Sequence, residues 1–368
     1  MKPDKNDINP VEESGKKAPK KRGHAARNAA IIVLCVFALL VGAAYFAVSH
    51  FYSKLNFVSA SERLDEQVTG ADVVAVPPTE RVTPKELDEE TGRNYSGKSV
   101  TNILLVGVDN DYLPGMDSRG NADGLIIASI NNDTKQLVLS SIMRDTKVTI
   151  PNSYSTKITL VYNYCGIQTL IETIEDNFKI PIDGYVMVNY LDVMDVVDAV
   201  GGVDLNLTES EIFYMSGKIE NLCELAGVPY SENMLTVDKA GQVHLNGLQT
   251  AAYLRVRLAG NGDYERTERA RNVLMQIKDK ALDMGITELL SFADTALPKI
   301  STDISKNTLL SMAMNISSIA KYETVSLRIP ADGMFYESQD GNAMIVPDLQ
   351  SNAEYLHSAV YGGALGKK

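Results

Sequence analysis

The chain has 368 residues with 35 basic and 47 acidic side chains, a net charge of −12. The simplest meaning of this acidity is solubility, and it argues against nucleic acid as the partner. Any site for an anionic ligand must therefore be a local concentration of arginine. The four histidines and three cysteines include no pair with the spacing of a zinc site.

The first predicted element is an apolar run at residues 29–48, which are twenty residues without a charge. A helix rises about 1.5 Å per residue, so this run spans roughly 30 Å, the thickness of a bilayer's hydrocarbon core. A secretory signal peptide is the alternative, but its apolar core is usually about 7–15 residues long and ends at a small-residue cleavage site. Here the run continues into Tyr45, Phe46 and Phe51. We therefore expect a retained transmembrane helix over residues 29–50.

The flanking charges predict the orientation of this helix. The first 28 residues hold 8 of the basic side chains and 4 of the acidic ones. Cations that precede a membrane span keep that end in the cytoplasm. We expect a cytoplasmic tail over 1–28, the cell membrane over 29–50, and the rest of the chain outside the cell. Residues 51–98 are polar and rich in proline and acidic residues, which predicts an extracytoplasmic stalk.

Beyond the predicted stalk, the sequence alternates between strand and helix patterns. Short apolar runs bounded by polar residues predict strands, and apolar residues at helical spacing predict helices. The strands are expected at 102–108, 124–130, 136–142, 185–190, 203–207 and 325–330, and the helices at 167–178, 191–200, 209–226 and 267–284. The alternation is typical of an α/β domain with helices on a central sheet. We expect this domain at 99–284, with 285–368 as its continuation because no linker intervenes.

Several common chemistries find no support in the motifs. The chain has no G-x-S-x-G elbow, no Walker A loop and no G-x-G-x-x-G sequence, which argues against a serine hydrolase or a nucleotide-binding protein. Cys35 lies in the predicted membrane span. Cys165 and Cys223 lie outside it and could form one disulfide, which their spacing alone does not establish.

Charged residues stand at the ends of three predicted strands. Asp109 follows 102–108, Asp123 precedes 124–130, and Arg144 with Asp145 comes just after 136–142. Ligands of α/β sheets bind at strand ends. One such residue alone is more often a solvated loop residue, but several together favour a site.

A second group of charges is rich in arginine. Arg255 and Arg257 are two residues apart in an expected strand, so their side chains would share a face and hold one anion. Arg266 and Arg269 begin an expected helix, whose N-terminus adds partial positive charge. The alternative is a surface helix rich in arginine and glutamate.

The two groups together predict a pyrophosphate site. Aspartates and arginines are expected to converge without a nucleophilic serine, cysteine or histidine. Mg²⁺ is often held by one or two carboxylates plus substrate phosphates, and arginine binds phosphate through two parallel hydrogen bonds. Phosphoryl transfer needs positioning and charge neutralisation more than covalent chemistry by the protein.

The chain resembles the LytR-CpsA-Psr family of Gram-positive envelope proteins from about residue 102 to 280, with a weaker continuation to about 362. The matching stretches include NILLVGVD, the aspartate of NADGLIIASIN, SIMRDTKVTIP, IPIDGYVMVNY, DAVGGVDLNL, LNGLQTAAYLRVR and GNGDYERTERARNVL. The resemblance implies a central mixed β-sheet flanked by helices, with an apolar pocket for a polyprenyl chain. It also implies an extracytoplasmic phosphotransferase, which moves a glycopolymer such as teichoic acid or capsule from polyprenyl pyrophosphate to peptidoglycan.

The resemblance also assigns residues. It implies that Asp109 and Asp123 bind Mg²⁺, with Mn²⁺ as an alternative. It further implies a set of arginines that bind the pyrophosphate, to which we add Arg269; the set is Arg144, Arg255, Arg257, Arg266 and Arg269. We expect catalysis to depend on Asp123, Arg144, Asp145, Arg255 and Arg257. The general base is left open between Asp145 and Asp123, and the other role for Asp145 is to orient Arg144.

Two positions depart from the family pattern. Asn121 stands where an arginine is frequent, with Arg119 close in sequence, and Ala270 stands where a glutamine is frequent. Each change removes a phosphate contact, while the paired Arg255 and Arg257 and both aspartates remain.

The expected partners are a polyprenyl-pyrophosphate-linked glycan, peptidoglycan and the membrane. Two other functions remain open: a non-catalytic envelope regulator that binds lipid-linked precursors, and an enzyme that only hydrolyses the pyrophosphate. Apolar residues of the sheet and of the helix after Arg266 are expected to line the lipid pocket, although each of them alone is more simply explained as core.

Overall fold

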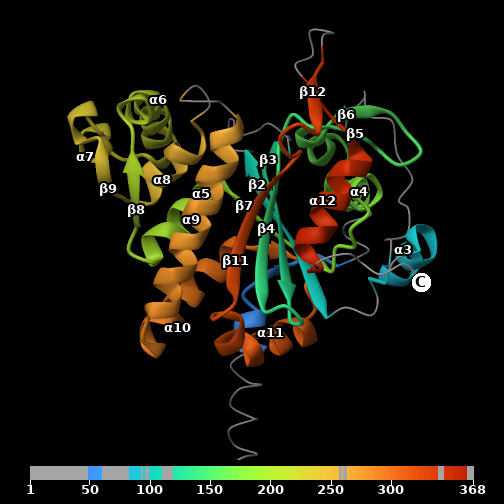
Figure 1. Ribbon diagram of the computed structural model, residues 1–368. Coiled ribbons are helices and arrows are strands. Elements are labelled where there is room, and N and C mark those ends of the chain that lie inside the picture. Colours follow the sequence, from blue (N-terminus) through green and yellow to red (C-terminus); the bar gives the residue numbers. More distant parts are fainter. Residues whose placement is uncertain are drawn as a thin grey trace, which may run out of the picture. The chain divides into compact units, whose positions relative to one another are not determined.

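The computed structural model describes residues 49–59, 83–92, 94–95, 99–109, 119–256, 259, 263–338 and 344–362 (Figure 1). At its centre lies a seven-stranded sheet in the order β1-β10-β7-β2-β3-β4-β11. The strands are β1 Asn56–Phe57, β2 Val100–Asp109, β3 Asn121–Asn131, β4 Gln136–Ile142, β7 Gly184–Asn189, β10 Ser301–Thr302 and β11 Glu323–Ile329. β2, β3 and β4 form an antiparallel meander, and β7 and β11 add to its two sides in parallel. The predicted central mixed sheet flanked by helices is confirmed.

Helices cover the sheet and enclose two apolar cores. α4 (Ile158–Phe178) and α12 (Leu349–Val360) pack with β2, β3, β4 and β11 around the larger core, whose members include Leu104, Ile127 and Leu356. The second core joins α5 (Tyr190–Ala199), α6 (Glu209–Ala226), α8 (Gly247–Leu254), α9 (Asp263–Asp283) and the ribbon of β8 (Val203–Leu207) and β9 (Gly241–Leu245). This α6–α9 portion forms the left side of Figure 1.

The remaining elements are short or lie at the periphery. They are α3 (Pro84–Thr91), β5 (Lys147–Thr149), β6 (Ser155–Lys157), α7 (Tyr230–Asn233), η1 (Val237–Lys239), α10 (Ile286–Ala296), η2 (Leu297–Lys299), α11 (Lys306–Ile319), β12 (Phe335–Glu337) and β13 (Ile345–Pro347). Residues 49–368 group as one compact unit, and the stretch 285–368 supplies β10 and β11 to the central sheet.

One predicted strand is wrong. The apolar stretch at 245–257 was expected to carry Arg255 and Arg257 in a strand, but β9 ends at Leu245 and α8 occupies Gly247–Leu254. Asn246 begins this helix because its side chain accepts a hydrogen bond from Gln249 N, while the Gln249 side chain accepts one from Asn246 N. Arg255 is the C-cap residue of α8, so the strand argument for a shared face does not apply to it.

Part of the predicted stalk contributes to the folded unit. β1 pairs in parallel with β10 at one edge of the sheet. Tyr95 is buried in the larger core, where its hydroxyl lies 2.9 Å from His357 Nδ1. His357 Nε2 lies 3.0 Å from the Phe178 carbonyl oxygen, so this imidazole links the end of α4 to Tyr95 and α12.

Two further expectations concern the membrane span and the cysteines. The predicted span 29–50 lies outside the described residues except for Ser49 and His50. Within the part of the chain that the structure describes, no helix is both long and apolar enough to cross a bilayer. Cys165 and Cys223 are buried free thiols on α4 and α6, so the disulfide that the sequence left open is not formed.

Candidate functional site

The two predicted metal-binding aspartates are placed by an irregularity in the β2–β3 ladder. Gly107 pairs with Gly124 and Val108 with Ala122, so Asp123 is an extra residue on β3. A β-bulge of this kind re-aims a side chain at the end of a strand pair. Asp109 is the last residue of β2, and both aspartates are buried, with 5% and 7% of their surface exposed.

Asp123 joins four parts of the fold through its two carboxylate oxygens. Arg144 Nη1 donates to Oδ1 at 2.7 Å from the loop after β4, and Thr159 Oγ1 donates to the same oxygen at 3.0 Å from the first turn of α4. Arg266 Nη2 donates to Oδ2 at 2.8 Å from α9. A buried carboxylate is tolerated because it is paired and hydrogen-bonded in this way.

Arg266 is held on a second side by Tyr190. Its Nη2 donates to the Tyr190 hydroxyl at 2.9 Å, and its Nε donates to the Leu254 carbonyl at 3.3 Å. Burial raises the pKa of Tyr190, so the hydroxyl stays protonated. Burial opposes the charge on Arg266, but Tyr190 and Asp123 outweigh it and raise its pKa. Arg266 is therefore a fixed cation, and its buried Nη1 has no hydrogen-bond partner among the described residues.

Arg255 and Asp109 complete the group. Arg255 Nη2 donates to Asp109 Oδ1 at 3.3 Å, and its guanidinium carbon lies 5.4 Å from the centre of the Tyr190 ring. This spacing is that of a cation–π contact. We call this group the charged cluster; its members are Asp109, Asp123, Arg144, Tyr190, Arg255 and Arg266. It brings together both predicted aspartates and three of the predicted arginines from distant parts of the sequence.

Of the other predicted site residues, Asp145 lies beside the charged cluster and Arg257 is not described. Arg144 Nε lies 3.8 Å from Asp145 Oδ2, and Lys157 Nζ lies 2.8 Å from Asp145 Oδ1. Asp145 therefore contacts the charged cluster through Arg144. Arg257 lies outside the described residues.

Arg269 is not brought into the charged cluster. It is buried, and it donates to Glu211 Oε1 and Glu265 Oε2 at 2.9 Å each, and to the carbonyls of Val256 and Ala259. Glu211 is itself fixed by the capping box that begins α6 at Thr208. The contacts of Arg269 thus hold α9 to α6 and to the segment between α8 and α9.

The two departures from the family pattern have different surroundings. The Asn121 side-chain oxygen accepts a hydrogen bond from Asn163 Nδ2 of α4 at 3.1 Å. Burial raises the pKa of the Cys165 thiol, and the positive charge of Arg119 partly offsets this effect. Cys165 precedes Gly166, where α4 is interrupted and φ is 79°. Ala270 lies in the wall of the cavity described next.

An apolar cavity of about 270 Å³ extends from the charged cluster between the sheet and helices α5 and α9. Asp123, Arg144, Tyr190 and Arg266 lie in its wall, and the rest of the lining is almost entirely apolar. The apolar lining includes Leu105, Val106, Val108, Leu125, Ile126, Val186, Val188, Val193, Val196, Leu254, Val273, Leu274, Ile277 and Ile300. Gly107 and Gly124, which face each other across the bulge, add no side chains to this wall.

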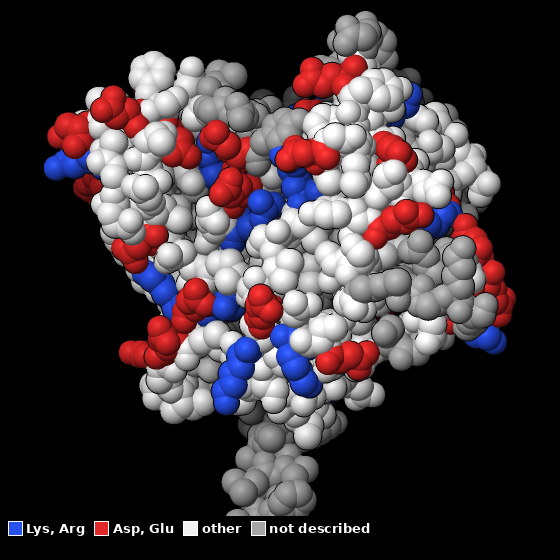
Figure 2. Space-filling view, viewed as in Figure 1, with Lys and Arg blue, Asp and Glu red and all other residues white. Residues whose placement is uncertain are grey.

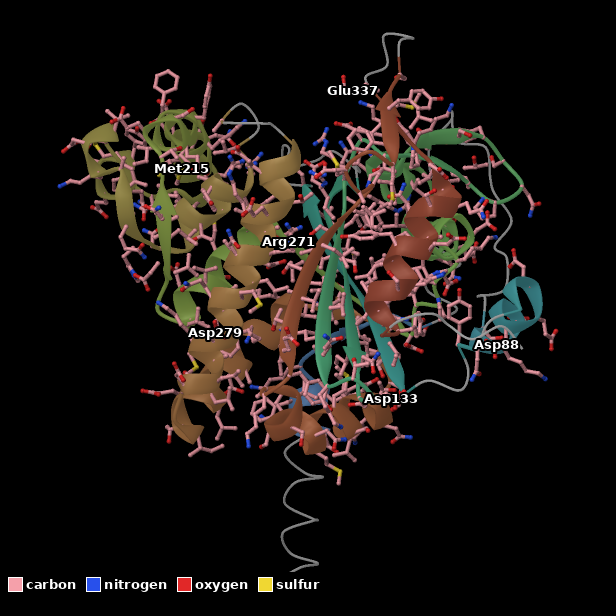
Figure 3. All side chains as sticks on the ribbon, viewed as in Figure 1. Asp88, Asp133, Met215, Arg271, Asp279 and Glu337 are labelled. Atoms are coloured by element: carbon pink, nitrogen blue, oxygen red, sulfur yellow. The ribbon has the colours of Figure 1, made fainter. Side chains whose placement is uncertain are left out.

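Basic side chains mark the same region of the surface. Figure 2 shows Lys and Arg gathered in the hollow at the centre of the view, with Asp and Glu around it. Arg271, labelled in Figure 3, lies on α9 and donates to Ser141 Oγ of β4 at 2.7 Å. Ser141 also lines the cavity, so Arg271 fastens α9 to the sheet along the cavity wall.

The sequence did not single out Thr159 or Tyr190. Thr159 lies in the first turn of α4, directly after β6, and local sequence does not reveal that this turn packs beside β3. Tyr190, however, ends the predicted strand at 185–190. The rule that selected charged residues at strand ends would have found it, had it been applied to hydroxyl groups as well.

Tyr190→Phe is expected to remove the hydrogen bond from Arg266 Nη2 to the hydroxyl and to keep the cation–π contact of Arg255 with the ring. A hydrogen bond to a charged group contributes about 1.5–3 kcal/mol, so the free energy of unfolding should fall by up to that amount. The apparent affinity for a pyrophosphate ligand should fall with it. Chemical denaturation measures the free energy of unfolding, and ligand titration measures the affinity. If neither quantity changed in the variant, Tyr190 would not position Arg266.

Known proteins resemble this chain in sequence. The LytR-CpsA-Psr family model matches residues 65–358. The chain is 28% identical over 264 residues to the polyisoprenyl-teichoic acid–peptidoglycan teichoic acid transferase TagU of Enterococcus faecalis, covering 69% of this chain and 80% of that protein. It is 27% identical over 264 residues to TagU of Oceanobacillus iheyensis, covering 70% and 75%.

Solved structures share the fold. The structure described as TagT bound to LI-WTA has a TM-score of 0.54 at 20% identity, covering 80% of this chain and 98% of that one. The crystal structure of Bacillus subtilis TagV has a TM-score of 0.53 at 24% identity, covering 72% and 98%. The family model spans most of the sequence, including every described member of the charged cluster, and the chain therefore belongs to the LytR-CpsA-Psr family.

Proposed function

We propose that this chain is an extracytoplasmic phosphotransferase, which moves a glycopolymer from a polyprenyl pyrophosphate carrier to a hydroxyl of peptidoglycan. The observation that carries the proposal is the apolar cavity with part of the charged cluster in its wall, namely Asp123, Arg144, Tyr190 and Arg266. Such a site matches an amphiphile with an anionic headgroup and a hydrocarbon chain. The names of the relatives, which are teichoic acid transferases, support a glycopolymer as the group transferred.

The arginines of the cluster suit the pyrophosphate of the donor. Arg144 and Arg266 approach the same carboxylate from two sides, so an anion beside Asp123 would meet both guanidinium groups. Arg266 Nη1 is the donor best placed to bind it, since it is buried and has no partner among the described residues. Arginine binds phosphate oxygens with charge-assisted hydrogen bonds that are about twice as strong as neutral ones.

A divalent cation fits the acidic members of the cluster if the substrate supplies further ligands. Asp109 and Asp123 offer oxygen atoms, which Mg²⁺ and Mn²⁺ prefer. Among the described residues no three His, Cys, Asp or Glu side chains form a metal-binding group, so the proposal assigns the remaining ligands to the substrate phosphates. When bound, Mg²⁺ would neutralise charge on the pyrophosphate oxygens.

In the proposed reaction, a peptidoglycan hydroxyl attacks the phosphorus nearer the glycan. A new phosphorus–oxygen bond forms as the bond to polyprenyl phosphate breaks, and the hydroxyl proton passes to a base. Asp123 already accepts hydrogen bonds from Arg144, Thr159 and Arg266. Asp145 lies between Arg144 and Lys157, which favours a role in orienting Arg144. The base remains open between these two carboxylates.

We further propose that the chain is anchored in the cell membrane by residues 29–50, with the domain outside. This places the cavity near a lipid-linked donor and within reach of the wall.

The test is to incubate the purified full-length chain with a polyprenyl pyrophosphate saccharide, Mg²⁺ and peptidoglycan oligomers. Mass spectrometry should detect a glycan joined to peptidoglycan through a phosphodiester, and a chelator should abolish this product until Mg²⁺ is restored. Phosphate release without a glycan adduct would identify a hydrolase instead. Donor binding without any product would identify a regulator.

A further inference from the structure

The end of the domain that carries α10 and α11 exposes large apolar side chains. Met314 and Ile316 of α11 are 77% and 53% exposed, and Ile286 at the start of α10 is 71% exposed. Leu289 and Leu290 of α10 are exposed as well. α11 has fourteen residues and none of them is buried. A surface helix of a soluble domain normally buries an apolar stripe. Exposed apolar side chains in this number indicate that another apolar surface covers them.

The first described residues tie these two helices together. Lys306 Nζ, at the start of α11, donates to Ser49 Oγ. A little further along the chain, Lys54 Nζ pairs with Asp294 Oδ1 of α10 at 2.6 Å, and Asn56 Nδ2 donates to the Pro298 carbonyl at 3.0 Å. α10 and α11 therefore flank the point at which the chain enters the domain, and Figure 1 shows them at one end of it.

The sequence identifies what covers this end. Ser49 comes directly after the uncharged apolar run at 29–48, which is long enough to span a bilayer. If residues 29–50 form the proposed anchor, the residues that contact Ser49 lie close to the lipid headgroups.

The charge of this segment also suits a lipid surface. Residues 304–322, which include α11, contain Lys306 and Lys321 and no acidic side chain. α10 carries two carboxylates, of which Glu288 accepts a hydrogen bond from Gly285 N and Asp294 pairs with Lys54, so the attraction to anionic lipids would come from α11. Interfacial helices combine apolar residues that enter the acyl boundary with cations that attract anionic lipids. The serine and asparagine side chains among the exposed positions of α11 suit the headgroup layer in the same way.

The cavity approaches the same end of the domain. Ile300, one of its lining residues, follows η2 directly, and η2 follows α10. Ile277 and Val196, from α9 and α5, line the cavity as well. The cavity lining therefore reaches the segment that follows α10, although no residue of α10 or α11 itself lies in its wall.

We propose that α10 and α11 form a membrane-docking surface, which rests on the outer leaflet with Ile286, Leu290 and Met314 at the acyl boundary. This inference depends on the proposed anchor at 29–50, and it adds a second contact that fixes the tilt of the domain. This contact would turn the Ile300 side of the cavity toward the membrane that holds the lipid-linked donor.

The chain has no tryptophan, so a single introduced tryptophan reports on one position. Met314→Trp and Ile286→Trp place the probe on the docking surface. Phe213→Trp on α6 and Tyr336→Trp on β12 are matched controls, because these side chains are 65% and 66% exposed and their helix and strand lie at the opposite end of the domain in Figure 1. The full-length variants are reconstituted in nanodiscs of phosphatidylcholine and phosphatidylglycerol, with or without bromine on the acyl chains.

Brominated lipids should strongly quench the fluorescence of the Met314→Trp and Ile286→Trp variants and leave the two control variants unchanged. Acrylamide should quench the controls and spare the two docking-surface variants. Equal responses from all four variants would overturn the proposal. Protection from acrylamide without quenching by brominated lipids would also overturn it, because a protein partner would then cover the surface. Co-elution of the chain with nanodiscs tests the anchor, and the transfer assay tests the proposed activity. Failure of the anchor or of the activity can therefore be distinguished from failure of the docking surface.

Discussion

Asp123→Asn should lower the rate of glycan transfer by about 10²–10³-fold, the loss typical of removing one fixed electrostatic contact from an active site. Asp123 is the residue to which Arg144 and Arg266 both donate, at 2.7 and 2.8 Å. An asparagine presents one oxygen and one NH₂ group, so at least one guanidinium group would lose its acceptor. The arginines would no longer be held in the arrangement proposed to receive pyrophosphate.

The same variant should lose stability, because breaking a buried ion pair from one side costs about 3–5 kcal/mol. Activity must therefore be measured on the folded fraction, with kcat and KM determined beside a denaturant titration. Asp279→Asn is a suitable control, since this carboxylate is 62% exposed and pairs with the neighbouring Lys278. Normal transfer by folded Asp123→Asn would remove Asp123 from the site.

Arg269→Met should reduce the free energy of unfolding by about 3–5 kcal/mol, because it leaves Glu211 buried without its cation. Arg269 is 2% exposed, and it donates to two carboxylates and two backbone carbonyls. A urea titration measures the loss. The affinity of the folded fraction for a pyrophosphate ligand should stay close to that of the wild type, since Arg269 takes no part in the charged cluster.

A double variant separates the two roles of Arg269. Glu211→Leu in the Arg269→Met background removes the unpaired charge and should recover part of the lost stability. Glu265→Gln, which alters the more exposed carboxylate, should cost much less. If Arg269→Met were as stable as the wild type but bound pyrophosphate poorly, the role expected from the sequence would be correct after all.

The strands and most helices were predictable because their apolar spacing is local. The predicted strands at 102–108, 124–130 and 136–142 lie within β2, β3 and β4, and the helix expected at 209–226 is α6. Asp109, Asp123 and Arg144 were found because charges at strand ends meet at one edge of a sheet. The orientation of Asp123 toward Arg144 and Arg266 depends on the bulge at this residue, for which the sequence has no clear signal.

The errors have physical causes as well. The stretch at 245–257 contains apolar residues that suit a strand, but the capping pair Asn246 and Gln249 starts a helix there. Arg266 and Arg269 are three residues apart on α9, close to one helical turn, so their spacing alone favours a shared site. Arg266 nevertheless reaches Asp123, while Arg269 reaches Glu211, 58 residues away in sequence. Only the packing of α6 against α9 decides that difference.

The most direct test of the central claim is a crystal structure of the chain with a polyprenyl pyrophosphate and Mg²⁺. The hydrocarbon chain should lie in the cavity between the sheet and helices α5 and α9, and Arg144 and Arg266 should bind the pyrophosphate beside Asp123. A lipid chain bound elsewhere, with the cavity filled by repacked side chains and the pyrophosphate away from Arg266, would contradict this claim.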